Sequence, residues 1–194
     1  INGADQTGIN FGNFAKFDIS GYKWNDLNGD KVWDDGETGI KDWFITLKRD
    51  SDNDGQYDDG TTTVQTGSDG KYSFNNLLPG KYQVTEGSLT GWVATFGAAW
   101  EFTGASGIDL HLGKTATPGN FGNFQLFSIS GIKYDDLDGD GTLTTNNPWS
   151  SPPVRIFIDK DSNGSYTPDV DPTALTGAGG AWTIGDLDWT VQGK

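Results

Sequence analysis

Hydrophobic and polar residues alternate in short segments along most of the chain. The clearest segments are "WFITLKR", "KYSF", "KYQVTE", "GWVATF" and "IDLHL", at residues 43–49, 71–74, 81–86, 91–96 and 108–112. Alternation of this kind, with β-branched and aromatic residues, is typical of half-buried strands. Gly, Asp, Asn and Pro separate the segments roughly every ten residues, and no window keeps a helical period over three turns. The pattern predicts an all-β fold, built as β-sandwiches of about 100 residues each.

The chain also repeats itself. "NFGNFAKFDISGYKWNDLNGD" (residues 10–30) matches "NFGNFQLFSISGIKYDDLDGD" (residues 120–140), an offset of 110 residues. Residues 66–77 match residues 176–187 at the same offset, and residues 44–57 resemble residues 154–166. A fixed offset is the mark of a repeated structural unit.

The repeat predicts four parts of the chain. We expect residues 1–13 to be a linker or a donor segment and residues 14–114 to be the first sandwich. Residues 115–124 are expected to be a linker, and residues 125–194 the second sandwich. The second unit has no counterpart of the late strands of the first, so the chain is interpreted as an excerpt of a longer array. The alternative is that a segment from a neighbouring molecule fills the gap by strand addition, which would make a filament.

The composition excludes several classes of function. There are 27 Asp and Glu residues against 13 Lys and Arg, with a net charge of -14, and only Glu37, Glu86 and Glu101 of the acidic residues are Glu. Asp favours turns, so the charge belongs in acidic loops. This charge argues against binding to nucleic acid or anionic membranes, and no apolar run is long enough for membrane insertion. The absence of Cys excludes disulfides and thiolate chemistry. A chain that starts at Ile1 and lacks Met is expected to be a mature or excised part of an exported protein.

The first acidic loop has the ligand spacing of a calcium site. Calcium takes six to eight oxygen ligands, and an EF-hand-like loop supplies them from positions 1, 3, 5, 7, 9 and 12. The expected ligands are the side chains of Asp26, Asn28, Asp30, Asp34 and Glu37, with the carbonyl of Val32 at position 7. Lys31 replaces the usual Gly at position 6, where a left-handed backbone is needed.

The second loop, "DSDNDGQYDD", has the same spacing. Its expected ligands are Asp50, Asp52, Asp54 and the carbonyl of Gln56, closed by Asp58 or Asp59. Carboxylates this close repel one another unless a cation lies between them. The other interpretation of each loop is a solvated acidic turn.

The second unit repeats both loops less completely. The third loop offers Asp136, Asp138, Asp140, the carbonyl of Thr142 and, at position 12, Asn147. The fourth offers Asp159, Asp161, Asn163 and Ser165, closed by Asp169 or Asp171. A neutral Asn147 where Glu37 stands in the first loop predicts weaker binding. No amphipathic helix flanks any of the loops, so they belong on turns between strands.

Other chemistry has weaker support. His111 is the only histidine, which is too little for a catalytic dyad or a zinc site. The tryptophans at positions 43, 92, 100 and 182 lie in strand patterns, so core packing is favoured over a sugar-binding platform. Lys23 and Lys133 could each form an isopeptide bond, but the sequence singles out no partner Asn. No catalytic residue is predicted.

Three blocks together resemble a known family. "GYKWNDLNGDKVWDDGETGI", "TLKRDSDNDGQYDD" and "TGSDGKYSFNNLLPGKYQV" occur in the order found in the calcium-binding B repeats of serine-aspartate-repeat adhesins, a branch of the Cna B-type domains. The resemblance implies tandem Ig-like (prealbumin-like), seven-stranded β-sandwiches whose inter-strand loops bind calcium. It further implies rigid stalk segments of extracellular proteins at the bacterial cell surface.

The predicted function is therefore a non-enzymatic, calcium-stabilised structural module of an adhesin, stalk or fibre. Its expected partners are Ca²⁺ and neighbouring repeats of the same protein, with a surface protein or a glycan as a further candidate. Two alternatives remain: a strand-exchanging filament subunit, and a carbohydrate- or protein-binding accessory module of a secreted enzyme.

Overall fold

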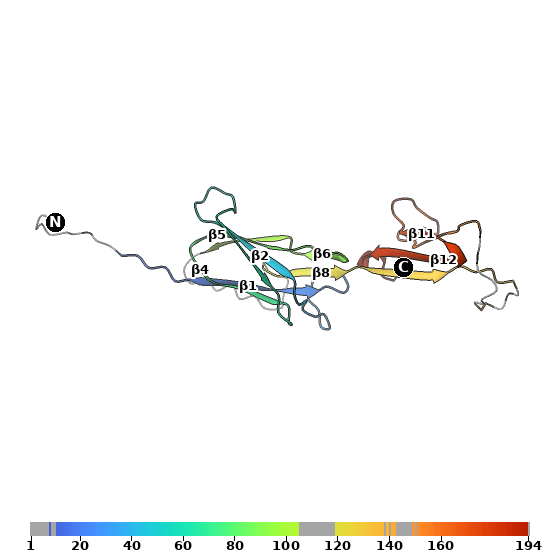
Figure 1. Ribbon diagram of the computed structural model, residues 1–194, viewed down its shortest axis with the longest axis horizontal. Helices are drawn as coiled ribbons and strands as arrows, with labels where there is room; N and C mark the ends of the chain where they lie inside the picture. The colour runs from blue at the N-terminus through green and yellow to red at the C-terminus, as the bar shows by residue number, and fades with distance from the viewer. Residues whose placement is uncertain are drawn as a thin grey trace, which may run out of the picture. The chain divides into compact units, whose positions relative to one another are not determined.

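The computed structural model describes residues 8, 11–104, 119–137, 139, 141–142, 149 and 151–193. The chain divides into two compact units. The first comprises Ile1–Trp24, Thr38–Gly87 and Phe96–Phe121, and the second comprises Asn25–Glu37, Ser88–Thr95 and Gly122–Lys194. Strands dominate the described residues (Figure 1), and none of the helices there is long and apolar enough to cross a membrane.

The first eight strands form two four-stranded sheets. One sheet has the order β4-β1-β8-β6 and the other has the order β3-β2-β5-β7. Their bounds are β1 (Phe17–Asn25), β2 (Phe44–Asp50), β3 (Gly60–Gln65), β4 (Lys71–Leu77), β5 (Gly80–Glu86), β6 (Trp92–Phe96), β7 (Ala99–Gly104) and β8 (Phe121–Gln125). The four alternating segments between residues 43 and 96 are confirmed as strands, and residues 108–112 lie outside the described part of the chain. The resemblance implies seven strands, whereas the described residues up to Gln125 form eight.

The core of the first unit lies between the two sheets. Alternate residues of each strand point inward, as the period of two requires; Ile45 and Leu47 of β2 and Val84 of β5 are all buried. The ring of Phe17 on β1 meets the ring of Tyr82 on β5 edge-on at 5.8 Å, which joins the two sheets. Burial of each such side chain contributes about 1.5–3 kcal/mol. The β-sandwich prediction is therefore confirmed for this unit.

Strand β8 differs from the expected linker. Residues 121–125 form a strand between β1 and β6, and only part of the segment 115–124 remains to connect the repeats. Phe121 is fully buried, and its ring lies 6.2 Å from that of Tyr72 on β4. The two phenylalanines of "NFGNF" account for the difference, because Phe121 and Phe124 are both buried. Figure 1 shows β1 and β8 pointing in the same direction.

The chain beyond Gln125 contains the remaining strands and two short 3-10 helices. Strand β12 (Ala181–Leu187) pairs with β9 (Phe127–Ile132), and β10 (Arg155–Phe157) pairs with β11 (Thr173–Leu175). The helices are η1 (Ala178–Gly180) and η2 (Trp189–Val191). A small core of Ile184, Leu187 and Val191 lies under these elements. Among the described residues after Gln125, each sheet therefore has two strands.

Candidate metal centres

The first acidic loop follows β1 and is organised by one buried carboxylate. Asp26 is fully buried, and its two oxygens accept hydrogen bonds from the backbone N–H groups of Gly29 (2.7 Å) and Lys31 (3.0 Å). Lys31 adopts the left-handed backbone, with φ of 71°, that position 6 of a calcium loop requires. The absence of Gly at that position therefore does not change the course of the loop.

Glu37 closes the first loop. Its carboxylate accepts hydrogen bonds from the N–H of Leu27 (2.7 Å) and of Asp34 (3.0 Å), so it joins the beginning of the loop to its end. Burial raises the pKa of Glu37, and the nearby negative charges of Asp26 and Asp34 add to the rise, while the two backbone hydrogen bonds oppose it. A cation at this position would favour the charged form.

The other polar residues of the first loop lie at the surface. The side-chain amide of Asn28 donates to Asp30 (3.1 Å) and to Asp34 (3.2 Å), which brings positions 3, 5 and 9 together. The N–H of Val32 donates to Asp30 (2.8 Å). Asn28, Asp30 and Asp34 therefore lie together at the surface, whereas Asp26 and Glu37 are buried. The described carboxylates of this loop do not form a group of three within 4.8 Å, as those of the second loop do.

The second loop connects β2 to β3 and repeats this arrangement. Asp50 is fully buried and accepts from the N–H groups of Asn53 (2.7 Å) and Gly55 (3.2 Å). The N–H of Gln56 donates to Asp54 (2.7 Å), as that of Val32 does to Asp30 in the first loop. Carboxylate oxygens of Asp50, Asp52 and Asp59 lie within 4.8 Å of one another.

Of the two residues proposed to close the second loop, Asp59 lies in the cluster. Its carboxylate accepts from the N–H and the hydroxyl of Ser51 and from the N–H of Asp52, and the hydrogen bonds from Ser51 lower its pKa. Asp58 is exposed and is not a member of the cluster. The sequence offered both because they are adjacent, and spacing alone does not decide which of two neighbouring side chains turns toward the loop.

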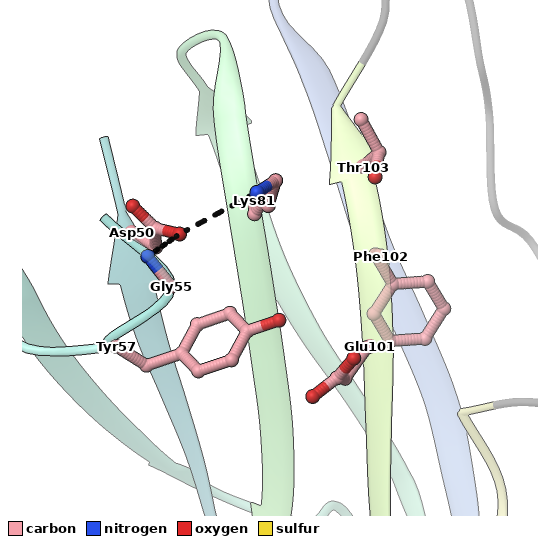
Figure 2. A pocket seen from close by; sticks show the side chains of 7 residues that line it. All are labelled: Asp50, Gly55, Tyr57, Lys81, Glu101, Phe102 and Thr103. Atoms are coloured by element: carbon pink, nitrogen blue, oxygen red, sulfur yellow. Dashed lines mark hydrogen bonds and ion pairs between the residues drawn. The ribbon is translucent and has the colours of Figure 1, made fainter. Parts of the chain in front are cut away.

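A cavity of about 540 Å³ opens beside the second loop (Figure 2). Its lining residues are Asp50, Gly55, Tyr57, Lys81, Glu101, Phe102 and Thr103. The Lys81 ammonium lies 3.8 Å from the Asp50 carboxylate, and burial together with the Glu101 carboxylate raises the pKa of Tyr57. The Lys81 ammonium therefore lies next to Asp50, the predicted ligand at position 1 of the loop.

The third loop follows β9 and begins as the first one does. Asp136 accepts from the N–H groups of Gly139 (2.8 Å) and Gly141 (2.9 Å), both with positive φ. Thr142 is exposed. The other predicted ligands of this loop, Asp138, Asp140 and Asn147, lie outside the described residues.

The fourth loop connects β10 to β11 and gathers a second cluster. Asp159 accepts from the N–H groups of Asn163 (3.1 Å) and Gly164 (2.8 Å), and the bond from Gly164 is the main cause of its lowered pKa. Carboxylate oxygens of Asp159, Asp161 and Asp171 lie within 4.8 Å of one another. Asp171 is buried, whereas Asp169 is exposed and is not in the cluster.

The remaining predicted ligands of the fourth loop hold its backbone. Asn163 donates from its side-chain amide to Asp161 (2.9 Å) and accepts from the N–H of Ser165 (2.7 Å). The described side chains at the predicted ligand positions carry oxygen donors, mainly carboxylates, which suit Ca²⁺ better than the softer metals that prefer nitrogen or sulfur. The residues present therefore fit a calcium ion.

One buried ion pair joins Lys23, which the sequence singled out, to Glu86, which it did not. Lys23 on β1 is fully buried, its ammonium lies 3.1 Å from the Glu86 carboxylate on β5, and it sits 4.6 Å above the ring of Trp43. Its ammonium also donates to the carbonyl of Phe121 (3.4 Å). A lysine within an alternating strand is ordinarily placed on the exposed face, so only the three-dimensional pairing reveals it.

The tryptophans pack into the fold. Trp24 and Trp43 are buried, and the other six, all in the described residues, are partly buried. Trp189 lies against Gly29 of the first loop, so close that a Cβ on that glycine would stand 2.1 Å from the ring, and both belong to the second unit. The side-chain amide of Gln192 donates to the carbonyl of Leu27 (3.1 Å). These contacts favour core packing over an exposed aromatic platform.

Comparison with known proteins relates part of the sequence to a family. Residues 17–112 match the model of the SdrD B-like domain. Serine-aspartate repeat-containing protein F of Staphylococcus epidermidis is 38% identical over 84 residues, which are 42% of this chain and 5% of that protein. Bone sialoprotein-binding protein of Staphylococcus aureus is 38% identical over 97 residues, 49% of this chain and 8% of that protein. The chain thus spans less than a tenth of either relative.

Solved structures also resemble the chain. The full-length major pilin SpaD of Corynebacterium diphtheriae has a TM-score of 0.41 and 17% identity, covering 66% of this chain and 36% of the pilin. The minor pilin GBS52 of Streptococcus agalactiae has a TM-score of 0.41 and 15% identity, covering 89% of this chain and 79% of the pilin.

The match to the family model runs from the first residue of β1 past the end of β7, and includes both acidic loops of the first repeat. The module is structural, and its location is extracellular, at the cell surface. Residues 17–112, just under half of the chain, thus match the SdrD B-like domain, and the same part of the chain resembles serine-aspartate repeat-containing proteins.

Proposed function

We propose that the chain is a calcium-stabilised structural segment of a surface adhesin, without enzymatic activity. The observation that carries this proposal is the recurrence of one loop architecture at four inter-strand positions. In each loop the first Asp accepts backbone N–H groups three or four and five residues further on, which fixes its carboxylate at the centre of a tight turn.

Repulsion among the clustered carboxylates supports calcium as the partner. Asp50 and Asp171 are buried, and each belongs to a group of three carboxylates within 4.8 Å. Like charges at this separation repel by about 1–4 kcal/mol per pair, depending on the local dielectric. A divalent cation bound by the group converts this repulsion into attraction, and it binds the folded loop in preference to the unfolded chain.

The residues that would hold the ions are the described members of each loop. Asp26, Asn28, Asp30, Asp34 and Glu37 would serve the first site, and Asp50, Asp52, Asp54 and Asp59 the second. Asp136 begins the third, and Asp159, Asp161, Asn163 and Asp171 would serve the fourth. In each case the ion supplies charge neutralisation, while the chain supplies the turn and its backbone hydrogen bonds.

The position of the first loop connects calcium binding to the stiffness of the chain. Its Gly29 lies against Trp189 and its Leu27 carbonyl accepts from Gln192, near the end of the second repeat, within one compact unit. Calcium that orders the first loop therefore also orders the surface on which Trp189 and Gln192 lie. We infer that the ion limits bending between repeats, as a stalk segment requires.

Isothermal calorimetry of the intact chain with Ca²⁺ tests the binding directly. We expect saturable binding of several ions, abolished by chelator and reproduced weakly by Mg²⁺, which demands a smaller and more regular octahedral site. Absence of any saturable heat with Ca²⁺ up to millimolar concentration would overturn the proposal.

A further inference from the structure

Position 5 is an acid in three of the acidic loops and an amide in the fourth. The residues there are Asp30, Asp54, Asp140 and Asn163. Asn163 is followed by Gly164, and glycine has no Cβ to hinder the approach of its backbone nitrogen to the preceding side chain. The fourth loop therefore holds an Asn-Gly pair, the dipeptide most prone to deamidation, at a predicted calcium ligand.

Deamidation of this pair needs no reactant other than water. The backbone nitrogen of Gly164 bonds to the side-chain carbonyl carbon of Asn163, and the bond from that carbon to the amide nitrogen breaks. The proton of the Gly164 N–H leaves with the amide nitrogen as ammonia. Water then opens the resulting succinimide ring at one of its two carbonyls. The products are Asp and isoaspartate, and each carries a new carboxylate.

The closed loop holds both reacting groups. The Gly164 N–H donates to the Asp159 carboxylate (2.8 Å). The Asn163 side-chain amide donates to the Asp161 carboxylate (2.9 Å) and to the Thr167 hydroxyl (2.7 Å). Cyclisation gives up all three hydrogen bonds, because the Gly164 nitrogen loses its proton and the amide nitrogen departs. The loop in this conformation therefore protects Asn163.

Two of these three acceptors are carboxylates that repel each other. Oxygens of Asp159 and Asp161 lie within 4.8 Å of one another and of the buried Asp171. The next step rests on the proposed function: calcium bound by the group keeps the loop closed, and without calcium the repulsion raises the fraction of open loops. The protection of Asn163 therefore depends on calcium.

Apart from these hydrogen bonds, little in the structure obstructs the pair. Asn163 and Gly164 are both exposed, and a Cβ on Gly164 would meet nothing within 4 Å beyond its neighbours in the chain. Packing therefore adds no second barrier to the reaction once the loop opens.

The first loop contains the same dipeptide in different surroundings. Asn28 is exposed, but Gly29 is buried, and a Cβ on it would stand 2.1 Å from the Trp189 ring. The Gly29 N–H donates to the fully buried Asp26 (2.7 Å). Packing as well as hydrogen bonding therefore holds Gly29, so Asn28 is an internal reference for the same chemistry.

We propose that the pair of Asn163 and Gly164 is a self-modifying site that calcium protects and calcium loss activates. The fourth loop then keeps an irreversible record of the time that the chain spends without calcium. The Asp product gives this loop the acid that the other three have. Isoaspartate adds a methylene group to the main chain, which moves the Gly164 N–H away from Asp159 and weakens the site.

Peptide mapping of the intact chain by mass spectrometry tests the proposal. The chain is incubated at mildly alkaline pH with saturating Ca²⁺ or with chelator. Trypsin then places Asn28 in residues 24–31 and Asn163 in residues 161–194. We expect Asn163 to deamidate at least about tenfold faster with chelator, since Ca²⁺ at about 100 times its Kd suppresses loop opening by about a hundredfold. With chelator, Asn28 should react more slowly than Asn163.

Two variants of the fourth loop form a matched pair. Asp159→Asn removes the charge that accepts the Gly164 N–H, and it should raise the rate at Asn163 in Ca²⁺ toward the rate in chelator. Asp169→Asn removes the same charge from an exposed residue outside the cluster, and it should leave the rate as in the parent. An unchanged rate at Asn28 shows that the first loop stays folded in each variant.

The possible outcomes separate this inference from the proposed function. If calorimetry shows calcium binding but Asn163 deamidates at the same rate in both buffers, the inference is wrong and the calcium proposal stands. Faster deamidation of Asn28 than of Asn163, or equal rates at Asn163 in Asp159→Asn and Asp169→Asn, would also overturn the inference. Absence of calcium binding would overturn both.

Discussion

Asp26 and Asp136, separated by 110 residues, hold their loops in the same way. Each carboxylate accepts from the N–H groups three and five residues further along, at 2.7 and 3.0 Å in the first loop and 2.8 and 2.9 Å in the third. The residues at these positions differ, with Lys31 in one loop and Gly141 in the other, yet both have φ above 70°. The conserved feature is therefore the geometry that the first Asp imposes, and it supports a common ligand for the four loops.

The second loop allows a matched test of its ligands. Asp52 lies in the three-carboxylate cluster and Asp58 does not, although both are exposed. Asp52→Asn should lower the calcium affinity of one site at least about tenfold, or about 1.4 kcal/mol. Asp58→Asn removes the same charge and should change that affinity by less than about threefold. Calorimetry distinguishes the two, and equal effects would refute the assignment of Asp52 as a ligand.

Lys81 should lower the calcium affinity of the second loop. Its ammonium lies 3.8 Å from Asp50, so a calcium ion bound there is repelled by it. Lys81→Met should raise the affinity of the second site by only a few fold, since the Lys81 side chain is partly exposed and its charge is partly screened by solvent. Lys48→Met, an exposed lysine on β2, is the control for the change of net charge. Weaker binding in Lys81→Met would indicate that Lys81 positions Asp50 and does not compete with the ion.

The ion pair between Lys23 and Glu86 should be important for stability whether or not calcium is present. Glu86→Ala leaves the buried Lys23 ammonium without its 3.1 Å partner, and such a loss costs about 3–5 kcal/mol. The double variant Lys23→Met with Glu86→Leu should recover most of the free energy of unfolding, because no charge then remains buried. Urea denaturation measures both. A single variant as stable as the parent would contradict the observed burial.

Tyr72 should make the first unit sensitive to alkali. Burial raises its pKa far above the ordinary value of 10, so the folded state keeps the proton while the unfolded state releases it. Stability is then constant below pH about 10 and falls above it, by up to about 1.4 kcal/mol per pH unit. Tyr72→Phe loses the hydrogen bond to the Gly119 carbonyl, at a cost of about 1 kcal/mol at neutral pH. It should also flatten the alkaline decline, and an unchanged decline would assign it to other groups.

Most strands could be predicted from the sequence, because alternation is a local property. Strand β2 and strand β5 lie where "WFITLKR" and "KYQVTE" indicate. Strand β8 was missed because its place between β1 and β6 depends on residues almost 100 positions away, and no local pattern separates it from a Gly-rich linker. The pair of Lys23 and Glu86 was missed for the same reason, because its two residues are far apart in the sequence.

The candidate site residues also include some that the sequence could predict and some that it could not. Spacing indicated the Asp that begins each acidic turn, because the turn that follows it is local. Spacing did not decide between Asp58 and Asp59, or between Asp169 and Asp171, because the closing residue is chosen by the direction in which the chain returns to the sheet. The structure places Asp59 and Asp171 in the clusters.

Thermal unfolding of the intact chain, with millimolar Ca²⁺ and after exhaustive chelation, tests the central claim most directly. A ligand that binds only the folded state at 100 to 1,000 times its Kd adds about 3–4 kcal/mol. For modules of about 100 residues this corresponds to a rise in Tm on the order of ten degrees or more, and the rise should continue with the logarithm of calcium concentration. The same Tm in both conditions would contradict the account.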